Sequence, residues 1–156
     1  MKEVLRLVTK SEQETRKVGQ FFAEEVRREK SGRAILVGLE GELGAGKTVF
    51  AKGFARGLGI KEEMKSPTFT LMRVFEIPRT KKPAWPSGRH FFLFDAYRLS
   101  GPKEFLALGF QNLLQNWANI ILVEWSDRVS KIFPKRYFLI RMRHLRKNAR
   151  EIGFYA

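Results

Sequence analysis

The sequence has no cysteine, which excludes disulfides and thiolate metal sites and is compatible with a reducing, cytoplasmic location. Its first residues are mixed in charge and no long apolar run follows them, so neither a signal peptide nor a membrane-spanning segment is predicted. Internal repeats, low-complexity tracts and an evident interdomain linker are also missing. We therefore expect one domain over residues 1–156.

Acidic residues are scarce, since 16 aspartates and glutamates face 30 lysines and arginines and the formal net charge is +14. A field of this sign attracts polyanions and speeds their encounter with the protein. One interpretation is a surface for RNA or for an acidic protein partner. The other is a basic surface that serves only solubility, and the composition does not decide between the two.

Residues 41–48 read Gly-Glu-Leu-Gly-Ala-Gly-Lys-Thr, the complete G-x-x-x-x-G-K-[ST] pattern of a phosphate-binding loop (P-loop). Glycines let the backbone N–H groups of such a loop turn inward around a polyphosphate. Lys47 can then reach the outer phosphates, and the Thr48 hydroxyl can bind a magnesium ion. The alternative is a glycine-rich turn that binds nothing.

The sequence around the loop favours phosphate binding. Residues 34–39 are a short apolar run, typical of a strand that is covered on both faces. After the loop, Phe50, Phe54 and Leu58 recur at helical spacing, and glycines end the pattern. A strand, a glycine loop and a helix in this order direct the positive end of the helix at the phosphates.

Two carboxylates are candidates for the metal end of this site, because each follows a buried strand. Glu124 ends the run 120–124 and Asp95 ends the run 90–95. The carboxyl ends of strands are where α/β sheets build ligand sites. One acid can hold the metal while the other orients a water. For Asp95 the alternative role is an ion pair with Arg98.

The other elements follow from periodicity, capping and turn signals. A capping box at Ser11–Glu14 starts a first helix, and a basic, proline-rich loop at 78–89 joins two neighbouring antiparallel strands. The expected elements are helices over about 11–29 and from Pro102 through Leu114, and strands over 68–77, 90–97, 119–125, 137–145 and 151–155, with a turn at 147–150 before the last.

Four motifs in this order resemble the TsaE family, which has the older name YjeE. They are Gly41-Glu-Leu-Gly-Ala-Gly-Lys-Thr48, Ser66-Pro-Thr-Phe-Thr-Leu71, Phe94-Asp-Ala-Tyr-Arg-Leu99 and Leu122-Val-Glu-Trp125. The resemblance implies an α/β, P-loop NTPase-like three-layer fold with a central mixed sheet flanked by helices. It also implies a cytoplasmic ATPase that uses ATP and Mg²⁺ and supports the formation of tRNA threonylcarbamoyladenosine. The partner implied is the TsaB–TsaD heterodimer, which the protein would dock on and reset.

The resemblance also implies roles for single residues. Lys47, Asp95 and Glu124 would serve catalysis, and Thr48 and Glu124 would bind the metal. Ser66 and Thr68 would act as a switch. The residues that would border or bind the nucleotide are Glu12, Thr15, Leu43, Gly44, Ala45, Gly46, Lys47 and Thr48. Apart from the resemblance, the basic strand face that carries Arg141 and Arg143 is a candidate for contact with a partner or with tRNA, as are Arg98 and Trp125.

Three features depart from the family pattern or leave room for other functions. Ala96 stands where leucine is usual, the loop at 78–89 is long and basic, and residues 135–150 contain no acid. No arginine is an evident arginine finger, so hydrolysis by the protein alone is expected to be slow. The alternatives are a P-loop kinase of small molecules, with 78–89 as its lid, and a basic RNA-binding module.

Overall fold

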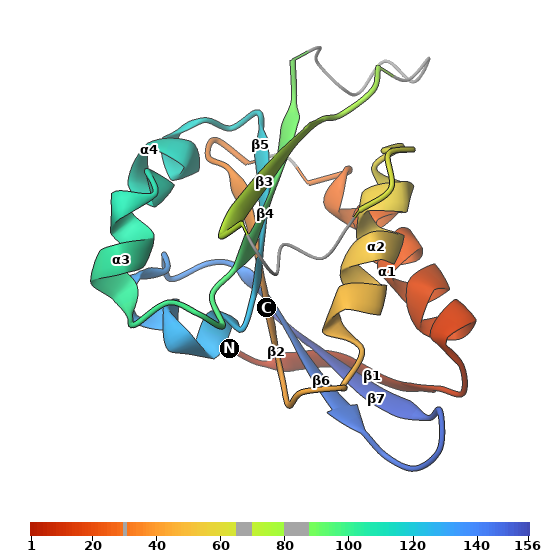
Figure 1. Cartoon of the computed structure of the whole chain (residues 1–156). Helices are drawn as coiled ribbons and strands as arrows, with labels where there is room; N and C mark the ends of the chain where they lie inside the picture. Colours follow the sequence, from red (N-terminus) through yellow and green to blue (C-terminus); the bar gives the residue numbers. More distant parts are fainter. Residues whose placement is uncertain (30, 65–69, 80–87) are drawn as a thin grey trace.

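The computed structural model describes residues 1–29, 31–64, 70–79 and 88–156 (Figure 1). The strands are β1 (Glu3–Thr9), β2 (Ile35–Gly41), β3 (Met72–Glu76), β4 (His90–Asp95), β5 (Asn119–Glu124), β6 (Phe138–His144) and β7 (Arg150–Tyr155). The helices are α1 (Glu12–Val26), α2 (Lys47–Gly57), α3 (Pro102–Ala107) and α4 (Phe110–Gln115), with short 3₁₀ turns η1 (Ser126–Arg128) and η2 (Ser130–Ile132).

The strands form one seven-stranded sheet in the order β1-β7-β6-β2-β5-β4-β3. Strands β6, β2, β5 and β4 pair in parallel, and β7 and β3 pair antiparallel with their neighbours. Because β1 is antiparallel to β7, it runs in the same direction as the parallel group. The predicted mixed sheet and P-loop-like α/β fold are therefore confirmed.

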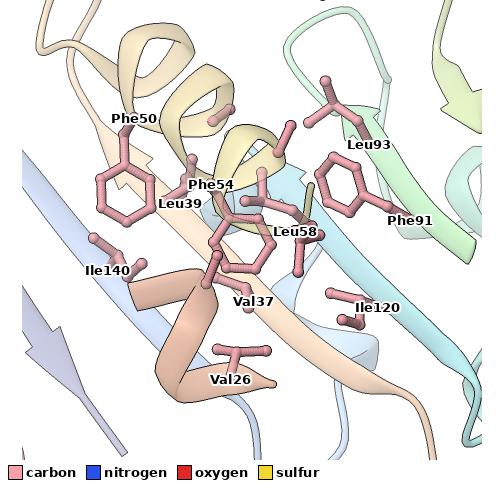
Figure 2. Packing of buried hydrophobic residues seen from close by; sticks show 14 of the residues in the cluster. Val26, Val37, Leu39, Phe50, Phe54, Leu58, Phe91, Leu93, Ile120 and Ile140 are labelled. Carbon is pink, nitrogen blue, oxygen red and sulfur yellow. The ribbon is translucent and has the colours of Figure 1, made fainter. Parts of the chain in front are cut away.

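Helices cover both faces of the sheet's centre, with α1 and α2 on one face and α3 and α4 on the other (Figure 1). The predicted stripe of α2 faces this core. Phe50, Phe54 and Leu58 pack against Val37 and Leu39 of β2 and against neighbouring strands (Figure 2). All of these side chains are buried, so the hydrophobic effect fixes α2, and with it the loop that precedes it, over the end of β2.

Helix α1 begins as the capping box predicts. Ser11 is its N-cap, and the Ser11 hydroxyl accepts a hydrogen bond from the Glu14 amide at 3.1 Å. The Glu14 carboxylate accepts one from the amide of Lys10 at 2.6 Å, one residue before the cap. The helix ends at Val26, earlier than predicted, and its Phe21 side chain is exposed.

Three other elements differ from the prediction. Strand β1 was not predicted, because it is an edge strand with a mixed, mostly exposed sequence that pairs only with β7. The helix expected after Pro102 is two short helices, because Gly109 between them has a φ of 85° that ends the first. Strand β3 begins at Met72, and residues 68–69 of the predicted strand lie outside the described residues.

Among the described residues, no helix has both the length and the apolar character that crossing a bilayer would require.

Candidate nucleotide-binding site

Strand direction gathers the predicted site at one edge of the sheet. The carboxyl ends of β1, β2, β4, β5 and β6 all meet this edge, because these strands run the same way. Helices α1 and α2 also begin there, so their positive ends face the same space. An α/β sheet with this arrangement offers its edge as a ligand site.

The P-loop connects β2 to α2 through backbone conformations that only glycine adopts easily. Gly44 has a φ of 80° and Gly46 a φ of 97°, both in the left-handed region. Gly46 is also in close contact with another residue, since a Cβ there would lie 2.6 Å from Arg150 Nε. The motif glycines are therefore explained by geometry, and the loop can present its N–H groups toward an anion.

Lys47 is buried, with 5 % of its surface exposed. Its Nζ donates to the carbonyl oxygens of Gly41 at 2.6 Å and Glu42 at 2.7 Å, and lies 3.8 Å from the centre of the Trp125 ring. Burial lowers the pKa of Lys47, and the Glu124 carboxylate opposes that shift. The ammonium group thus lies beside the loop, with two carbonyl oxygens and the face of the Trp125 ring as its partners. An anionic ligand in the same place would stabilise its charge.

The acidic end of the site is formed by neighbouring strands. Glu124 of β5 pairs in register with Asp95 of β4, and Thr48 Oγ1 donates to Glu124 Oε2 at 3.3 Å. Burial, then the nearby Asp95, raises the pKa of Glu124 to about 7 against the opposing effects of Thr48 and Lys47. Within the described part of the chain, Glu124 Oε1 is buried and has no hydrogen-bond partner. A buried carboxylate oxygen left in this state needs a cation or a donor from a ligand.

These oxygens suit a magnesium ion. The Thr48 hydroxyl and the Glu124 carboxylate are hard oxygen ligands of the type that Mg²⁺ prefers. No cluster of three or more carboxylate or imidazole side chains exists within the described ranges, so such an ion would take its other ligands from phosphate and water. Asp95 lies beside this pair, with its Oδ1 accepting from the Tyr97 amide at 2.9 Å.

A cavity of about 250 Å³ lies over the loop. Its lining residues are Glu12, Leu43, Gly44, Gly46, Lys47, Thr48, Val49, Glu124, Trp125 and Arg150. The structure therefore brings together eight of the residues singled out in the sequence. Ala45 is fully buried behind the loop, and Asp95 stands next to the cavity lining through Glu124.

Thr15 is placed differently from the other predicted nucleotide residues. It is fully buried, and its hydroxyl shares a 2.7 Å hydrogen bond with Thr9. The same hydroxyl donates to the Ser11 carbonyl at 3.1 Å. These contacts tie the end of β1 to the first turn of α1, and a nucleotide contact of Thr15 stays a prediction.

Trp125 follows Glu124 in a strained conformation, with a φ of 59° that a bulky residue rarely adopts. Its ring lies 4.7 Å from the Tyr97 ring and covers Lys47 Nζ. Backbone strain of this kind persists only where the surrounding packing enforces it, and it is frequent at functional sites. The strain turns the chain sharply after β5 and places the indole on the cavity wall.

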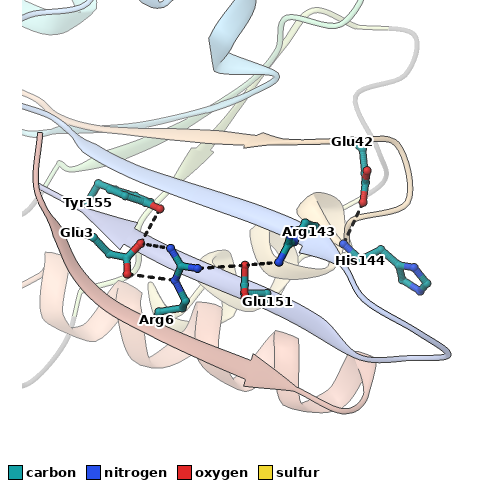
Figure 3. A network of polar contacts seen from close by, with 7 residues as sticks. All are labelled: Glu3, Arg6, Glu42, Arg143, His144, Glu151 and Tyr155. Atoms are coloured by element: carbon teal, nitrogen blue, oxygen red, sulfur yellow. Dashed lines mark hydrogen bonds and ion pairs between the residues drawn. The ribbon is translucent and has the colours of Figure 1, made fainter.

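Of the candidates for partner or RNA contact, Trp125 lines the cavity and the three arginines do not. Arg141 and Arg143 sit on the exposed face of β6, where Arg141 Nε pairs with Glu40 at 2.9 Å and Arg143 with Glu151 at 3.2 Å (Figure 3 draws the second pair). Their charges are thus partly neutralised by carboxylates. Arg98 follows β4 with interactions of its own. Ser66, Thr68 and most of the 78–89 loop lie outside the described residues.

Sequence reasoning missed Arg150. The residue was assigned to a turn before the last strand, whereas it is the first residue of β7 and lines the cavity. The only signal in the sequence was a lone arginine at the start of a strand-like segment, which is too common to single out a site. Its role depends on which strands lie next to β7, and no local pattern encodes that.

Comparison with known proteins agrees with this geometry. The family model described as threonylcarbamoyl adenosine biosynthesis protein TsaE matches residues 9–152. The tRNA threonylcarbamoyladenosine biosynthesis protein TsaE of Treponema pallidum is 34 % identical over 148 residues, which are 95 % of this chain and 98 % of that protein. The Haemophilus influenzae protein of the same name is 35 % identical over 122 residues, 78 % of this chain and 71 % of that one.

A solved structure is also similar. The crystal structure of Bacillus subtilis YdiB superposes with a TM-score of 0.72 at 26 % identity, covering 99 % of this chain and 86 % of that chain. Fold and sequence thus point the same way over nearly the whole molecule. The chain belongs to the TsaE family.

Proposed function

We propose that this protein binds and hydrolyses ATP as an accessory protein in tRNA threonylcarbamoyladenosine biosynthesis, docking in the cytoplasm on the TsaB–TsaD complex and resetting it. Membership of the TsaE family supports the pathway, because the family and its similar relatives carry that description. The single observation that carries the nucleotide chemistry is the 3.3 Å contact of Thr48 Oγ1 with Glu124 Oε2 at the open end of the P-loop.

The residues divide the work by position. The backbone N–H groups of residues 43–48 and the start of α2 hold the phosphates. Thr48 and Glu124 would hold a magnesium ion, and this ion would neutralise charge on the outer phosphates. Asp95, next to Glu124 in the sheet, orients a water toward the terminal phosphate.

Lys47 changes partners when nucleotide binds. Its Nζ now donates to two carbonyl oxygens and lies over the Trp125 ring. An outer phosphate offers a stronger, charge-assisted partner, so Nζ turns from the carbonyls to the phosphate. Because burial lowers the pKa of Lys47 in the free protein, the added negative charge also secures its protonated form.

Hydrolysis by the isolated protein is slow in this proposal. This chain supplies the two carboxylates, and docking on TsaB–TsaD would supply the further charge that stabilises the transition state at the terminal phosphate. The basic surface, with a net charge of +14, favours encounter with tRNA or with an acidic partner. The coupling of hydrolysis to a partner gives the ATPase cycle its role in resetting the complex.

The test measures ATP turnover for the wild type and for Lys47→Ala, each alone and with TsaB–TsaD. We expect slow turnover by the wild type alone, faster turnover in the complex, and loss of both in Lys47→Ala. Lys17→Ala is the matched control, since Lys17 is an exposed lysine of α1 outside the cavity lining. Equal rates for wild type and Lys47→Ala in the complex would refute the proposal.

A further inference from the structure

Arg150 is a buried cation at the edge of the nucleotide cavity. As the first residue of β7 it stands between Thr9, the last residue of β1, and His144, the last of β6. Its side chain is 9 % exposed and lines the cavity together with P-loop residues. A guanidinium at this depth is costly unless its donors and its charge find partners.

The partners that Arg150 has are incomplete. One terminal nitrogen donates to the Asn148 carbonyl at 2.8 Å, and the other lies 4.0 Å from Glu12 Oε1. That carboxylate is 64 % exposed, so water screens the pair and it offsets little of the desolvation. Arg150 Nε is buried and, within the described residues, has no hydrogen-bond partner. The Arg150 guanidinium can therefore accept a further anion, one that approaches it more closely than the Glu12 carboxylate does.

The P-loop packs closely against Arg150. Gly46 faces the Arg150 side chain so closely that a Cβ would lie 2.6 Å from its Nε and 2.7 Å from its Cδ. The residue before the P-loop lysine thus leaves room for a guanidinium beside the N–H groups that would hold a phosphate. Donors from the backbone and from Arg150 converge on the same cavity.

The position of Arg150 in the sheet indicates which part of the ligand it meets. The order β7-β6-β2-β5 puts Arg150 and Glu124 on opposite sides of the P-loop strand. Thr48 and Glu124 mark the metal and the outer phosphates. The end with Arg150 and Glu12 is therefore the end where the phosphate chain joins the nucleoside.

We propose that Arg150 binds the inner phosphate of the nucleotide, exchanging its long contact with Glu12 for a charge-assisted bond to a phosphate oxygen. This inference rests on the proposed nucleotide function and deepens it. It separates two roles in one cavity: Thr48 and Glu124 act on the outer phosphates, while Arg150 anchors the part that ATP and ADP share. An arginine fork suits this task because it presents several donors in a fixed plane.

Calorimetric titration with ATP and with ADP tests the assignment. We expect Arg150→Gln to weaken the binding of both nucleotides alike by about ten- to a hundredfold, the usual effect of losing a hydrogen bond to a charged group. Arg150→Lys keeps the charge and loses the planar guanidinium, so its affinity for each nucleotide should lie between those of the wild type and Arg150→Gln. Arg146→Gln removes an exposed arginine from the same hairpin and should change both affinities less than about twofold.

The possible outcomes are distinct. If Arg150→Gln binds ADP like the wild type, the inference is wrong and the proposed function stands, whether or not turnover falls. If the wild type itself binds neither nucleotide, both the proposed function and the inference are wrong.

A measurement on the wild type covers the case in which Arg150→Gln does not fold. The assigned Arg150 Nε–H signal in a ¹⁵N-resolved NMR spectrum should move saturably as ADP is added, because Nε gains a phosphate as a neighbour. A signal that keeps its position at saturating ADP would overturn the inference.

Discussion

The centre of the sheet and its antiparallel wing, formed by β1, β6 and β7, carry charged side chains in opposite ways. In the wing, charges are paired and at least partly exposed: Arg6 contacts Glu3 at 2.6 Å and Glu151 at 3.6 Å, on a face that no helix of the described residues covers (Figure 3). At the centre, Lys47 and Glu124 are 5 % and 4 % exposed. The Oε1 atom of that glutamate is without a hydrogen-bond partner in the described part of the chain.

The difference separates charges that are paired at the surface from buried charges whose pairing is incomplete. Exposed ion pairs contribute little to stability because water and salt screen them. Buried charges without full compensation cost stability, and a fold retains them where a ligand supplies the missing partner. Arg150 lies on β7 and so belongs to the wing, but its side chain is buried like those of Lys47 and Glu124 at the centre. For this reason we propose that it is part of the site.

The largest effect that the comparison predicts is on catalysis. Glu124→Gln removes the carboxylate that we propose as the anionic metal ligand while keeping its shape, so turnover of ATP should fall by roughly a hundred- to a thousandfold. Glu3→Gln makes the same change in the wing and should leave turnover unchanged, because Glu3 contacts only Arg6 and Tyr155 among the described side chains. Steady-state phosphate release measures both. Similar losses of ATP turnover in the two variants would contradict the distinction between the charges of the centre and those of the wing.

The second prediction concerns the same glutamate and stability in the absence of nucleotide and magnesium. Folding raises the pKa of Glu124 from 4.5 to about 7, so the folded state binds this proton more tightly than the unfolded state. The free energy of unfolding should therefore fall as pH rises from about 4.5 to 7, by about 3 kcal/mol in all. Glutamine does not titrate, so Glu124→Gln avoids this loss.

Urea unfolding at pH 4.5 and pH 8 measures the difference. The gain in stability of Glu124→Gln over the wild type should be small at pH 4.5 and largest at pH 8. The groups that face Glu124 are Thr48, Lys47, Lys52 and Asp95, and of these Asp95 adds to the shift. A gain that is the same at both pH values would show that the carboxylate is not destabilised by its burial.

How far the sequence predicts the molecule depends on how local each feature is. The P-loop, its flanking strand and helix, and the acids at the ends of β4 and β5 were predictable, because motif spacing and strand ends fix them within short segments. Strand β1 was missed because its partner is the far end of the chain, with Glu3 opposite Tyr155. Its own sequence carries no apolar face long enough to reveal a strand.

Arg150 was missed for a related reason. Its place in the cavity follows from the register of β7 against β1 and β6 and from the missing side chain at Gly46. Each of these facts is tertiary, and a sequence pattern for a turn at 147–150 gives no hint of them. The glycine itself was predicted from the P-loop pattern, but its second function, making room for an arginine, required the structure.

The third prediction applies the contrast to packing. Gly53 of α2 lies against α1, where a Cβ would be 2.0 Å from the Arg16 carbonyl oxygen, so Gly53→Ala should force the helices apart. We expect a loss of about 1–3 kcal/mol in the free energy of unfolding. In the wing, a Cβ at Gly153 would meet the Tyr155 ring at 3.0 Å, and that partly exposed side chain can move aside.

Gly153→Ala is therefore the control, with an expected loss well below that of Gly53→Ala. Denaturant midpoints of the two variants compare them directly. Equal losses of stability would mean that the wing packs as rigidly as the contact between α1 and α2, which would contradict the prediction.

The smallest effect is predicted for Arg143, whose side chain is 63 % exposed and pairs with Glu151 at 3.2 Å. Arg143→Ala should change the free energy of unfolding by less than about 1 kcal/mol, because Glu151 keeps Arg6 as a partner and salt screens the lost pair. Urea unfolding at low and high salt measures it, and a loss above about 2 kcal/mol would contradict the assignment.

The same variant tests what the surface is for. If Arg143 serves a partner, Arg143→Ala keeps its stability and its ATP turnover alone but captures TsaB–TsaD or tRNA less well. Weaker capture that also becomes less sensitive to salt would identify tRNA backbone as the contact, because each phosphate contact contributes to the salt dependence of binding. Unchanged capture of both would leave Arg143 as a solvated charge, as its exposed pair with Glu151 indicates.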